Sequence, residues 1–449
     1  MINSKVFLTD LFLLQELFAP QYSKLAIFDP LHRLDEVLDR NFIKLGSPLL
    51  VPQEDVLMID LSIFYIGTHL DEEYAHLCYI NNPDGSIRWI FDKKDNNANY
   101  LSLYNTGTIK GRVYRTVTQF ATKFHLGNKL ASGEMCVQQQ LIVALKEKMG
   151  LSEKEELSFF TGTRGATRKI VAEIHKGIYT SGFAKIPTNE LSKQLIENEE
   201  AMLNYLNQYD FTTLSLPSVI KRVNGTTRLS NIKPSLTIPA DRITAIHSKA
   251  LAELYAISND SKRIKEIVSW SCICNNLNWL KQEVLFTNNT NIAQAGKLVQ
   301  LLRKLFLSID DTEQVAVSVS HGDFTPWNMY CDEQRLYVYD WELAQNGIPM
   351  LFDLYHFTFQ TTILQNRKDF IGVKDAMLKW SIQPLIQQII HKYRINANTN
   401  YKLYLLFTVS HYLRQYILEK ELLMQSEWMV NAWVLALEDV TEVAQTRNL

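Results

Sequence analysis

The chain has 449 residues, 46% of them hydrophobic and 21% charged, which is enough apolar material for two or three packed domains and argues against disorder. A formal net charge of -2 provides no excess of positive charge to hold a nucleic-acid backbone, so we expect no nucleic-acid partner. The five cysteines are an odd and scattered set, which argues against a disulfide framework, and we interpret Cys272 and Cys274 as buried structural thiols rather than metal ligands.

The amino-terminal segment, MINSKVFLTDLFLLQELFAP, does not have the pattern of a secretory signal. It lacks a basic first region, and Asp10 and Glu16 interrupt its apolar stretch. No run approaches the roughly 20 uncharged apolar residues that span a bilayer. The nearest, at 403–417, contains His411 and Arg414. We therefore expect a cytoplasmic protein without a transmembrane segment, while association with a membrane surface stays open.

Residues 1–150 are predicted to form a mixed α and β region. A helix is expected near residues 8–17, a strand within 56–66, and a hairpin whose strands AHLCYI and SIRWIF flank the turn NNPDGS. A further helix is expected from Cys136 to Lys148, ending at Gly150. No chemical motif stands out here, so the role of this region is left open.

Residues 151–238 are predicted to form a small antiparallel sheet with one helix. The run FFTGTRGATRKIVAEI places two glycines and several small or hydroxyl residues between apolar strand ends. The short strand FAKI contains Lys185, and the helical segment ELSKQLIENEEAMLNYLNQY contains Glu199. The order is therefore strand, glycine turn, strand, strand with lysine, and helix with glutamate.

This order suits the binding of phosphate groups. Backbone N–H groups of a glycine turn can approach phosphates closely, and a strand lysine can neutralise them when a helix glutamate fixes its position. Glu199 is preferred because it borders the apolar stripe of its helix, with Glu200 as the fallback and Lys169 as the alternative lysine. The residues predicted to hold the nucleotide are Gly162, Thr163, Arg164, Gly165, Lys185 and Glu199.

Residues 239–449 are predicted to be mainly helical, interrupted by two short strands that flank the loop HGDFTPWN. Asp323 is followed five positions later by Asn328 and then, after an apolar strand, by Asp340. In a phosphoryl-transfer site one carboxylate orients the attacking hydroxyl, while an amide oxygen and a second carboxylate hold Mg²⁺ against the phosphates. The spacing therefore favours phosphoryl transfer.

The motifs HGDFTPWN, YDWELAQNGIP and FDLYHF together resemble the aminoglycoside phosphotransferase and choline kinase family, a branch of the protein-kinase-like fold. The resemblance spans roughly Phe159 to the carboxyl terminus and is weaker at the glycine turn and the lysine. It implies an α+β, two-lobed fold preceded by an extra mixed α/β region. Residues 1–150 would have an unknown role, 151–238 would bind the nucleotide, and 239–449 would hold the catalytic loop, the metal and the acceptor.

The resemblance also implies roles for particular residues. Asp323 would be the catalytic base, Asn328 and Asp340 would be the magnesium ligands, and ATP would be the phosphate donor. His321 would brace the loop, with a catalytic histidine as the alternative, and Asp353 would tie the backbone of the loop to a core helix.

Two tryptophans and one glutamate are given supporting roles. Trp327 and Trp341 would pack the loop. Glu342 would face the active site or hydrogen-bond to neighbouring loops.

The acceptor implied by this resemblance is a small molecule with a hydroxyl group: a sugar, a glycoconjugate precursor or an amino alcohol. The extra amino-terminal region favours a biosynthetic kinase over a minimal drug-resistance enzyme. The alternative is a nucleotide-binding pseudokinase scaffold whose amino-terminal region recruits a partner. The sequence leaves open the choice between ATP and GTP and the oligomeric state.

Overall fold

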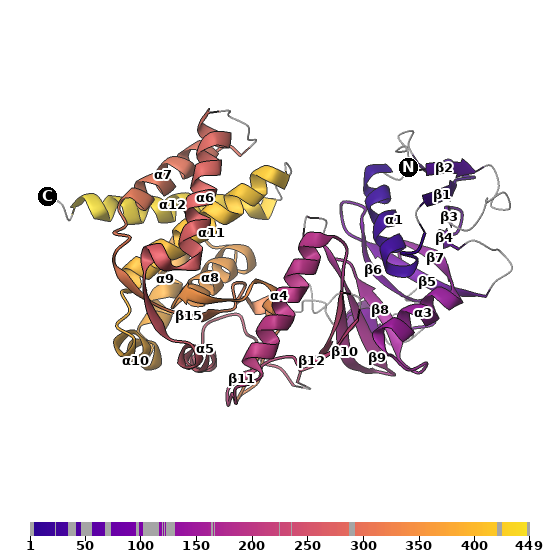
Figure 1. Cartoon of the computed structure of the whole chain (residues 1–449), viewed down its shortest axis with the longest axis horizontal. Coiled ribbons are helices and arrows are strands. Elements are labelled where there is room, and N and C mark those ends of the chain that lie inside the picture. The colour runs from indigo at the N-terminus through magenta and orange to yellow at the C-terminus, as the bar shows by residue number, and fades with distance from the viewer. Residues whose placement is uncertain are drawn as a thin grey trace. The chain divides into compact units, whose positions relative to one another are not determined.

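The chain divides into two compact units, one rich in strands and one rich in helices (Figure 1). The β-rich unit comprises residues 1–200 and 217–231, and the helical unit comprises residues 201–216 and 232–449. The expected α+β class is confirmed. This computed structural model describes residues 4–22, 24–34, 42–45, 56–67, 73–95, 98–101, 116–118, 120, 122, 131–162, 165, 167–223, 225–234, 236–286, 292–419 and 424–446.

The described strands of the β-rich unit form one 12-stranded sheet in the order β12-β13-β10-β9-β8-β6-β5-β7-β4-β3-β1-β2. Their bounds are β1 (Lys24–Phe28), β2 (Phe42–Leu45), β3 (Val56–Asp60), β4 (Tyr65–Ile66), β5 (Tyr74–Asn81), β6 (Ile87–Asp92), β7 (Gly133–Gln138), β8 (Glu156–Phe160), β9 (Lys169–Lys176), β10 (Tyr179–Pro187), β12 (Val219–Val223) and β13 (Thr226–Ser230). The predicted hairpin is present as β5 and β6.

The sheet runs without a break from residues 1–150 into the following residues. Strands β6 and β8 pair antiparallel, with Trp89 opposite Phe160 and Ile90 opposite Phe159. The region expected to have a separate role is therefore continuous in structure with the expected nucleotide-binding region. The functional division at residues 150 and 238 stays a prediction.

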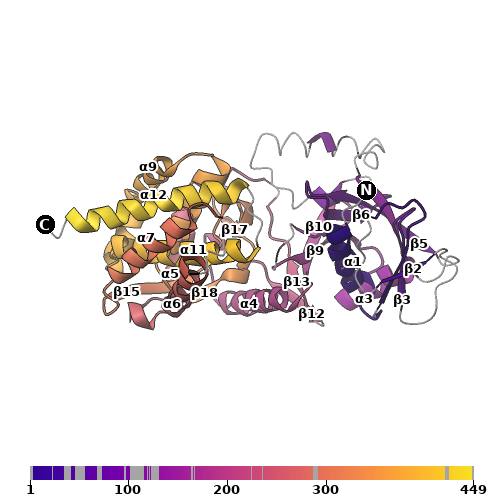
Figure 2. The ribbon, with the colours of Figure 1, turned by 90° about the horizontal axis from the view of Figure 1, so that it is seen from above.

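Helices α1 (Ser4–Phe18) and α3 (Gln139–Met149) lie within the curve of this sheet (Figure 2). One apolar cluster joins Leu11 and Leu14 of α1 to Leu141 of α3 and to Ile170 and Ala184 of the central strands. Burying a side chain of leucine size stabilises a fold by about 1.5–3 kcal/mol. The amino-terminal helix and the strands of the expected nucleotide-binding region therefore share one core.

The predicted helix from residue 136 begins too early. Residues 133–138 form strand β7, and the helix starts at Gln139. The run Met135, Cys136 and Val137 is buried, and a short, continuously apolar run has the same sequence pattern in a buried strand as in a buried helix. The helix ends as predicted at Gly150, whose φ of 67° is the left-handed conformation that glycine adopts readily.

The helical unit contains two small sheets and a set of packed helices. One sheet has the order β11-β17-β16 and the other β14-β15-β18. Helix α8 is buried at every position, and α11 packs against it as well as against α6, α7 and α12. Helix α4 (Glu190–Leu206) begins in the β-rich unit and ends in the helical unit.

The bounds of the helical unit's elements are β11 (Leu214–Ser215), α5 (Ala245–Ile257), β14 (Asp260–Arg263), α6 (Val268–Leu280), α7 (Ala295–Leu307), β15 (Gln314–Ser320), β16 (Met329–Cys331), β17 (Leu336–Val338), β18 (Gln345–Pro349), α8 (Phe352–Phe359), α9 (Phe370–Ser381), α10 (Pro384–Lys392), α11 (Ala397–Glu419) and α12 (Met424–Thr446). Among the described residues, no helix is both long and apolar enough to cross a membrane.

The cysteines depart in part from the expectation of buried thiols. Cys78 and Cys331 are buried, and burial raises the pKa of each thiol to about 11, so both are protonated at neutral pH. Cys272 is exposed on α6 and Cys274 is half-buried. The interpretation of the C-x-C pair as buried structural thiols is therefore wrong for Cys272.

Candidate active site

The loop after strand β15 is held by the carboxylate of Asp353 on α8. Asp353 Oδ2 accepts the N–H of His321 at 2.9 Å, and Oδ1 accepts the N–H of Gly322 at 3.1 Å and the hydroxyl of Ser320 at 2.8 Å. Gly322 has a φ of 82°, and a Cβ atom there would lie 2.4 Å from the carbonyl oxygen of Leu343. The loop conformation therefore requires glycine, and Asp353 braces the backbone as the motifs predicted.

His321 is occupied by backbone contacts on both ring nitrogens. Its Nε2 lies 2.8 Å from the carbonyl oxygen of Tyr339, to which it donates, and its Nδ1 accepts the N–H of Asp323 at 3.2 Å. The ring is fully buried and packs against Trp341, with 4.7 Å between centroids. A ring engaged in this way is a brace, and the geometry does not support the alternative of a catalytic histidine.

The two tryptophans of the motifs behave differently. Trp341 is fully buried and donates its indole N–H to the carbonyl oxygen of Val338 at 3.0 Å, so it packs the loop as expected. Trp327 is 40% exposed and so is not buried as Trp341 is, and its packing of the loop stays a prediction. Glu342 is half-buried.

Asp323 and Asn328 are joined by their side chains. The Asn328 amide donates to Asp323 Oδ2 at 2.8 Å and to its carbonyl oxygen at 3.0 Å. The Asp323 side chain is 28% exposed, so its carboxylate is accessible from solvent. The hairpin of β16 and β17 then brings the carbonyl oxygen of Asn328 within 2.8 Å of the N–H of Tyr339, the residue before Asp340. The fold thus places the three predicted residues at one end of this hairpin.

These residues carry oxygen atoms of the kind that bind Mg²⁺ together with phosphate. Because the Asn328 amide nitrogen faces Asp323, its Oδ1 is the atom left to act as a metal ligand, and the half-buried Asp340 supplies a carboxylate. Among the described residues, no group of three or more His, Cys, Asp or Glu side chains is placed to hold a metal. Mg²⁺ needs only one or two protein carboxylates when phosphates and waters complete its shell.

The structure adds a residue that the motifs did not identify. His356 on α8 is 1% exposed, and its Nε2 lies 3.1 Å from Asp323 Oδ1. It comes three residues after Asp353, and positions three apart share a helix face. The spacing of three residues between Asp353 and His356 in FDLYHF was the sequence signal that could have identified His356.

In the β-rich unit, Lys185 of β10 pairs with Glu199 of α4. The lysine Nζ lies 2.8 Å from Oε1 and 2.7 Å from Oε2, and the side chains are 8% and 1% exposed. Glu197 and Glu200 instead contact Arg222. The glutamate preferred from the helical pattern is thus the one that lies against the lysine.

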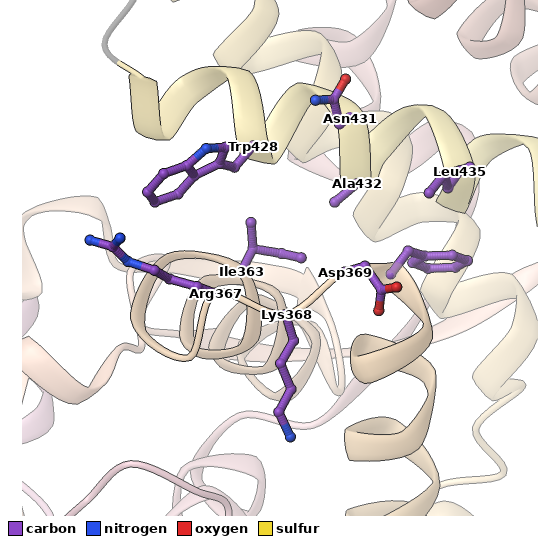
Figure 3. A pocket seen from close by; sticks show the side chains of 9 residues that line it. Ile363, Arg367, Lys368, Asp369, Trp428, Asn431, Ala432 and Leu435 are labelled. Atoms are coloured by element: carbon purple, nitrogen blue, oxygen red, sulfur yellow. The ribbon is translucent and has the colours of Figure 1, made fainter.

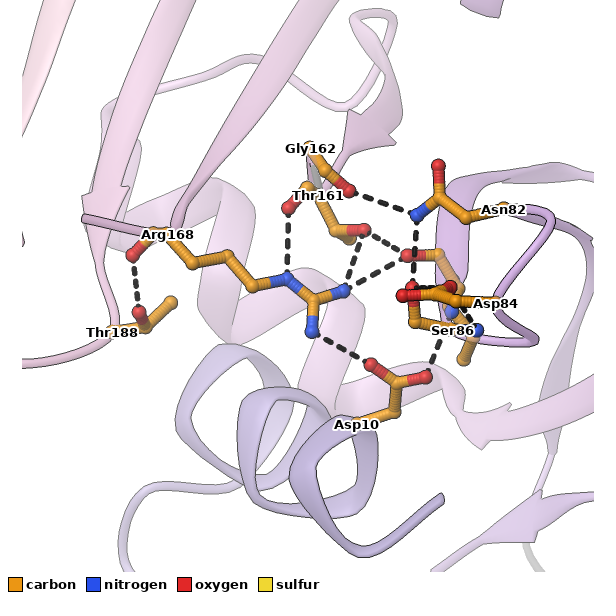
Figure 4. Close-up of polar contacts among 9 residues, drawn as sticks. Asp10, Asn82, Asp84, Ser86, Thr161, Gly162, Arg168 and Thr188 are labelled. Carbon is orange, nitrogen blue, oxygen red and sulfur yellow. Dashed lines mark hydrogen bonds and ion pairs between the residues drawn. The ribbon is translucent and has the colours of Figure 1, made fainter. Parts of the chain in front are cut away.

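The two ends of the glycine turn are held by the amino-terminal region (Figure 4). The Gly162 carbonyl accepts the Asn82 amide at 3.1 Å, and Arg168 forms a buried ion pair with Asp10 at 2.8 Å. Arg168 also donates to the carbonyl oxygen of Thr161 at 3.0 Å. Sequence reasoning missed the contacts of Asn82 and Asp10, because they join residues far apart in the chain. Gly165 is exposed, and the predicted Thr163 and Arg164 lie outside the described residues.

A cavity of about 90 Å³ adjoins the loop in the helical unit. Its wall includes Gly322 of the loop, Gln345, His356 of α8, and His411 and Tyr412 of α11. A larger hollow of about 280 Å³ lies between α12 and the start of α9, where Arg367 stacks over Trp428 (Figure 3). None of the predicted site residues lines that hollow, whereas the smaller cavity borders the loop.

No protein-family model matches the chain, and no curated protein matches it. Among solved structures, the streptomycin–ATP complex of APH(2")-IIa matches at 14% identity over 66% of this chain and 97% of that chain, with a TM-score of 0.42. Aminoglycoside phosphotransferase APH(4)-Ia matches at 13% identity over 67% and 98%, with a TM-score of 0.43. A candidate fructosamine-3-kinase of Haemophilus somnus matches at 12% identity over 66% and 94%, with a TM-score of 0.38.

Aminoglycoside phosphotransferases are thus among the structures to which this chain is similar. With identities of 12–14% and TM-scores below 0.5, these likenesses are distant.

Proposed function

We propose that the protein is a small-molecule kinase that transfers the γ-phosphate of ATP to a hydroxyl group of a small acceptor. The observation that carries the proposal is the Asp323 carboxylate, which is 28% exposed, hydrogen-bonded by Asn328, and mounted on a loop braced by Asp353. Asp323 would accept a hydrogen bond, and then the proton, from the acceptor hydroxyl. Phosphoryl transfer through a loose transition state depends mainly on such positioning and on charge neutralisation.

The remaining predicted residues would manage the charge of the nucleotide. Asn328 Oδ1 and the Asp340 carboxylate would hold Mg²⁺, which when bound neutralises phosphate charge and aligns the phosphate. Lys185, fixed by Glu199, would contact phosphate oxygens. The glycine turn predicted at residues 162–165 would supply main-chain N–H groups to phosphate oxygens.

The acceptor is proposed to be a sugar, a glycoconjugate precursor or an amino alcohol. The described residues that line the cavity beside the loop include no Asp, Glu, Lys or Arg, and they offer hydroxyl, amide and imidazole groups together with aromatic rings. Burial, with a contribution from Arg414, lowers the pKa of His411, so that imidazole is neutral at pH 7. An uncharged wall supports a neutral hydroxylated acceptor more than a polycation, which would need carboxylates.

The decisive measurement is phosphate transfer by the purified chain with ATP and Mg²⁺ against a panel of sugars, amino alcohols and aminoglycosides. Asp323→Asn is expected to lower turnover by orders of magnitude while nucleotide binding stays intact, because it removes the proton acceptor but not the phosphate contacts. Asp375→Asn, at an exposed acid on α9, is the matched control. Near-normal turnover in Asp323→Asn would contradict the role of Asp323.

The alternative, a pseudokinase scaffold, predicts a different result. It requires tight ATP binding without transfer to any acceptor. A scaffold does not require a base together with an amide and a carboxylate that bind the metal. The presence of Asp323, Asn328 and Asp340 at one end of the hairpin therefore favours the kinase.

A further inference from the structure

His356 holds the oxygen of Asp323 that Asn328 does not hold. Its Nε2 lies 3.1 Å from Asp323 Oδ1, while the Asn328 amide lies 2.8 Å from Oδ2. One partner comes from α8 and the other from the loop itself. The carboxylate is therefore contacted on both oxygens by groups from separate parts of the fold.

The direction of the His356 contact follows from the chemistry of the two atoms. An ionised carboxylate oxygen can only accept, so the imidazole nitrogen that faces it must carry the hydrogen. The other ring nitrogen, Nδ1, is buried and has no hydrogen-bond partner among the described residues. With the hydrogen on Nε2, Nδ1 carries no hydrogen, so no buried N–H group is left without an acceptor. The geometry therefore makes the Nε2–H group of His356 the donor to Asp323 Oδ1.

The His356 ring is fixed by aromatic neighbours. It stacks on Tyr412 with 6.5 Å between centroids and 18° between planes, and it meets Tyr404 edge-on at 6.3 Å. Burial raises the pKa of both tyrosines well above the ordinary value, so both are neutral phenols. The ring is 1% exposed and also borders the cavity beside the loop, so its position is held by these aromatic neighbours and by its contact with Asp323.

We propose that His356 is a positioning residue for the proposed phosphoryl transfer, which fixes the rotation of the Asp323 carboxylate so that a free lone pair faces the acceptor hydroxyl. The inference rests on the proposed function. Asn328 alone would hold one oxygen, and the carboxylate could still turn about its Cβ–Cγ bond. A misplacement of about 1 Å in a reacting group can cost about 100-fold in rate. A second fixed donor should therefore raise the rate of transfer by a measurable amount.

The test compares two amide substitutions of similar chemistry. In His356→Gln the amide nitrogen can occupy the place of Nε2, whereas in His356→Asn it reaches only the place of Nδ1. We expect the Gln variant to keep most of the turnover and the Asn variant to lose about 10- to 100-fold in kcat, with the KM for ATP unchanged in both. Thermal unfolding of each variant measures any loss of stability.

Several outcomes would overturn the inference. Equal kcat values in the two variants would show that the position of the donor does not matter, and a loss in kcat matched by a loss of folded protein would show a purely structural role. If the Asn variant does not fold, His356→Met, which fills the space without a donor, replaces it. A wild-type chain that transfers no phosphate would contradict the proposed function itself, whereas active wild type with an unimpaired Asn variant would contradict only the positioning role.

Discussion

At the scale of single residues, the ion pair of Lys185 and Glu199 affects both the stability of the fold and the proposed contact with phosphate. Both side chains are buried, at 8% and 1% exposed, and the lysine Nζ contacts both carboxylate oxygens. Removing one partner of a buried ion pair leaves an uncompensated charge and costs about 3–5 kcal/mol, whereas replacing both by apolar residues is often neutral. The two contributions can therefore be separated by mutation.

We predict that Lys185→Met destabilises the chain by about 3–5 kcal/mol and that adding Glu199→Leu restores most of that loss. Neither variant should bind ATP normally, because no ammonium group remains for the phosphates. Urea unfolding measures the stability, and the KM for ATP measures the phosphate contact. A double variant with a normal KM for ATP would show that another cation, with Lys169 first to examine, contacts the phosphates.

Among single residues, the local sequence pattern predicted neighbours within one loop and missed neighbours from other elements. The spacing of Asp323, Asn328 and Asp340 predicted that these residues lie together, because all three are on one loop and hairpin. His356 and Arg168 were missed because their partners come from other elements, and an isolated histidine or arginine gives no signal of its partner.

At the scale of elements, the first turn of helix α5 contains a histidine that links stability to pH. His247 is fully buried, its Nδ1 lies 3.3 Å from the N–H of Thr244, and its ring meets Phe324 and Phe357 edge-on. Burial lowers the pKa of His247 from 6.5 to about 4. Between these pH values the unfolded chain binds a proton that the folded chain does not, so the stabilisation present above pH 6.5 is lost as the pH falls.

We predict that the free energy of unfolding falls between pH 6.5 and 4 by up to about 1.4 kcal/mol per pH unit through this group. His247→Gln is the matched control, since glutamine does not titrate and suits the third position of a capping box that starts at Thr244. Urea unfolding at pH 7, 6 and 5 gives both slopes. Identical slopes for wild type and variant would contradict the assignment.

The elements themselves were predictable where the pattern was long. The β5–β6 hairpin, the first helix and the end of α3 at Gly150 are where the sequence placed them. The start of α3 was misplaced because three buried apolar residues before it fit a strand or a helix equally well. The pairing of β7 with β4 and β5 decides between them.

At the scale of the whole molecule, the amino-terminal 150 residues form part of the core of the β-rich unit. Strand β6 covers the edge of β8, and α1 contributes Leu11 and Leu14 to the cluster that also holds Ile170. The buried Arg168 depends on Asp10 for its charge partner. Removing residues 1–150 would therefore expose a strand edge, an apolar face and a buried cation together.

We predict that residues 151–449 alone are insoluble or unfolded and that supplying residues 1–150 as a separate chain restores part of the soluble, ATP-binding protein. Soluble yield, circular dichroism and nucleotide binding measure the outcome. A soluble 151–449 fragment that binds ATP as tightly as the full chain would show that the first 150 residues are dispensable for the fold. The full-length Asp10→Asn variant is a smaller perturbation that complements this test. It leaves the sheet whole and removes only the charge partner of Arg168.

The sequence by itself determined the features whose parts lie close along the chain: the loop with Asp323 and Asn328, the strand before Asp340, and the order of glycine turn, lysine and glutamate. Hydrophobic periodicity shows which face of an element is buried. The hydrophobic effect is non-directional, so the pattern does not determine which other element covers that face. Only the tertiary structure therefore decided that β8 pairs with β6, that Asp10 reaches Arg168, and that His356 lies against Asp323.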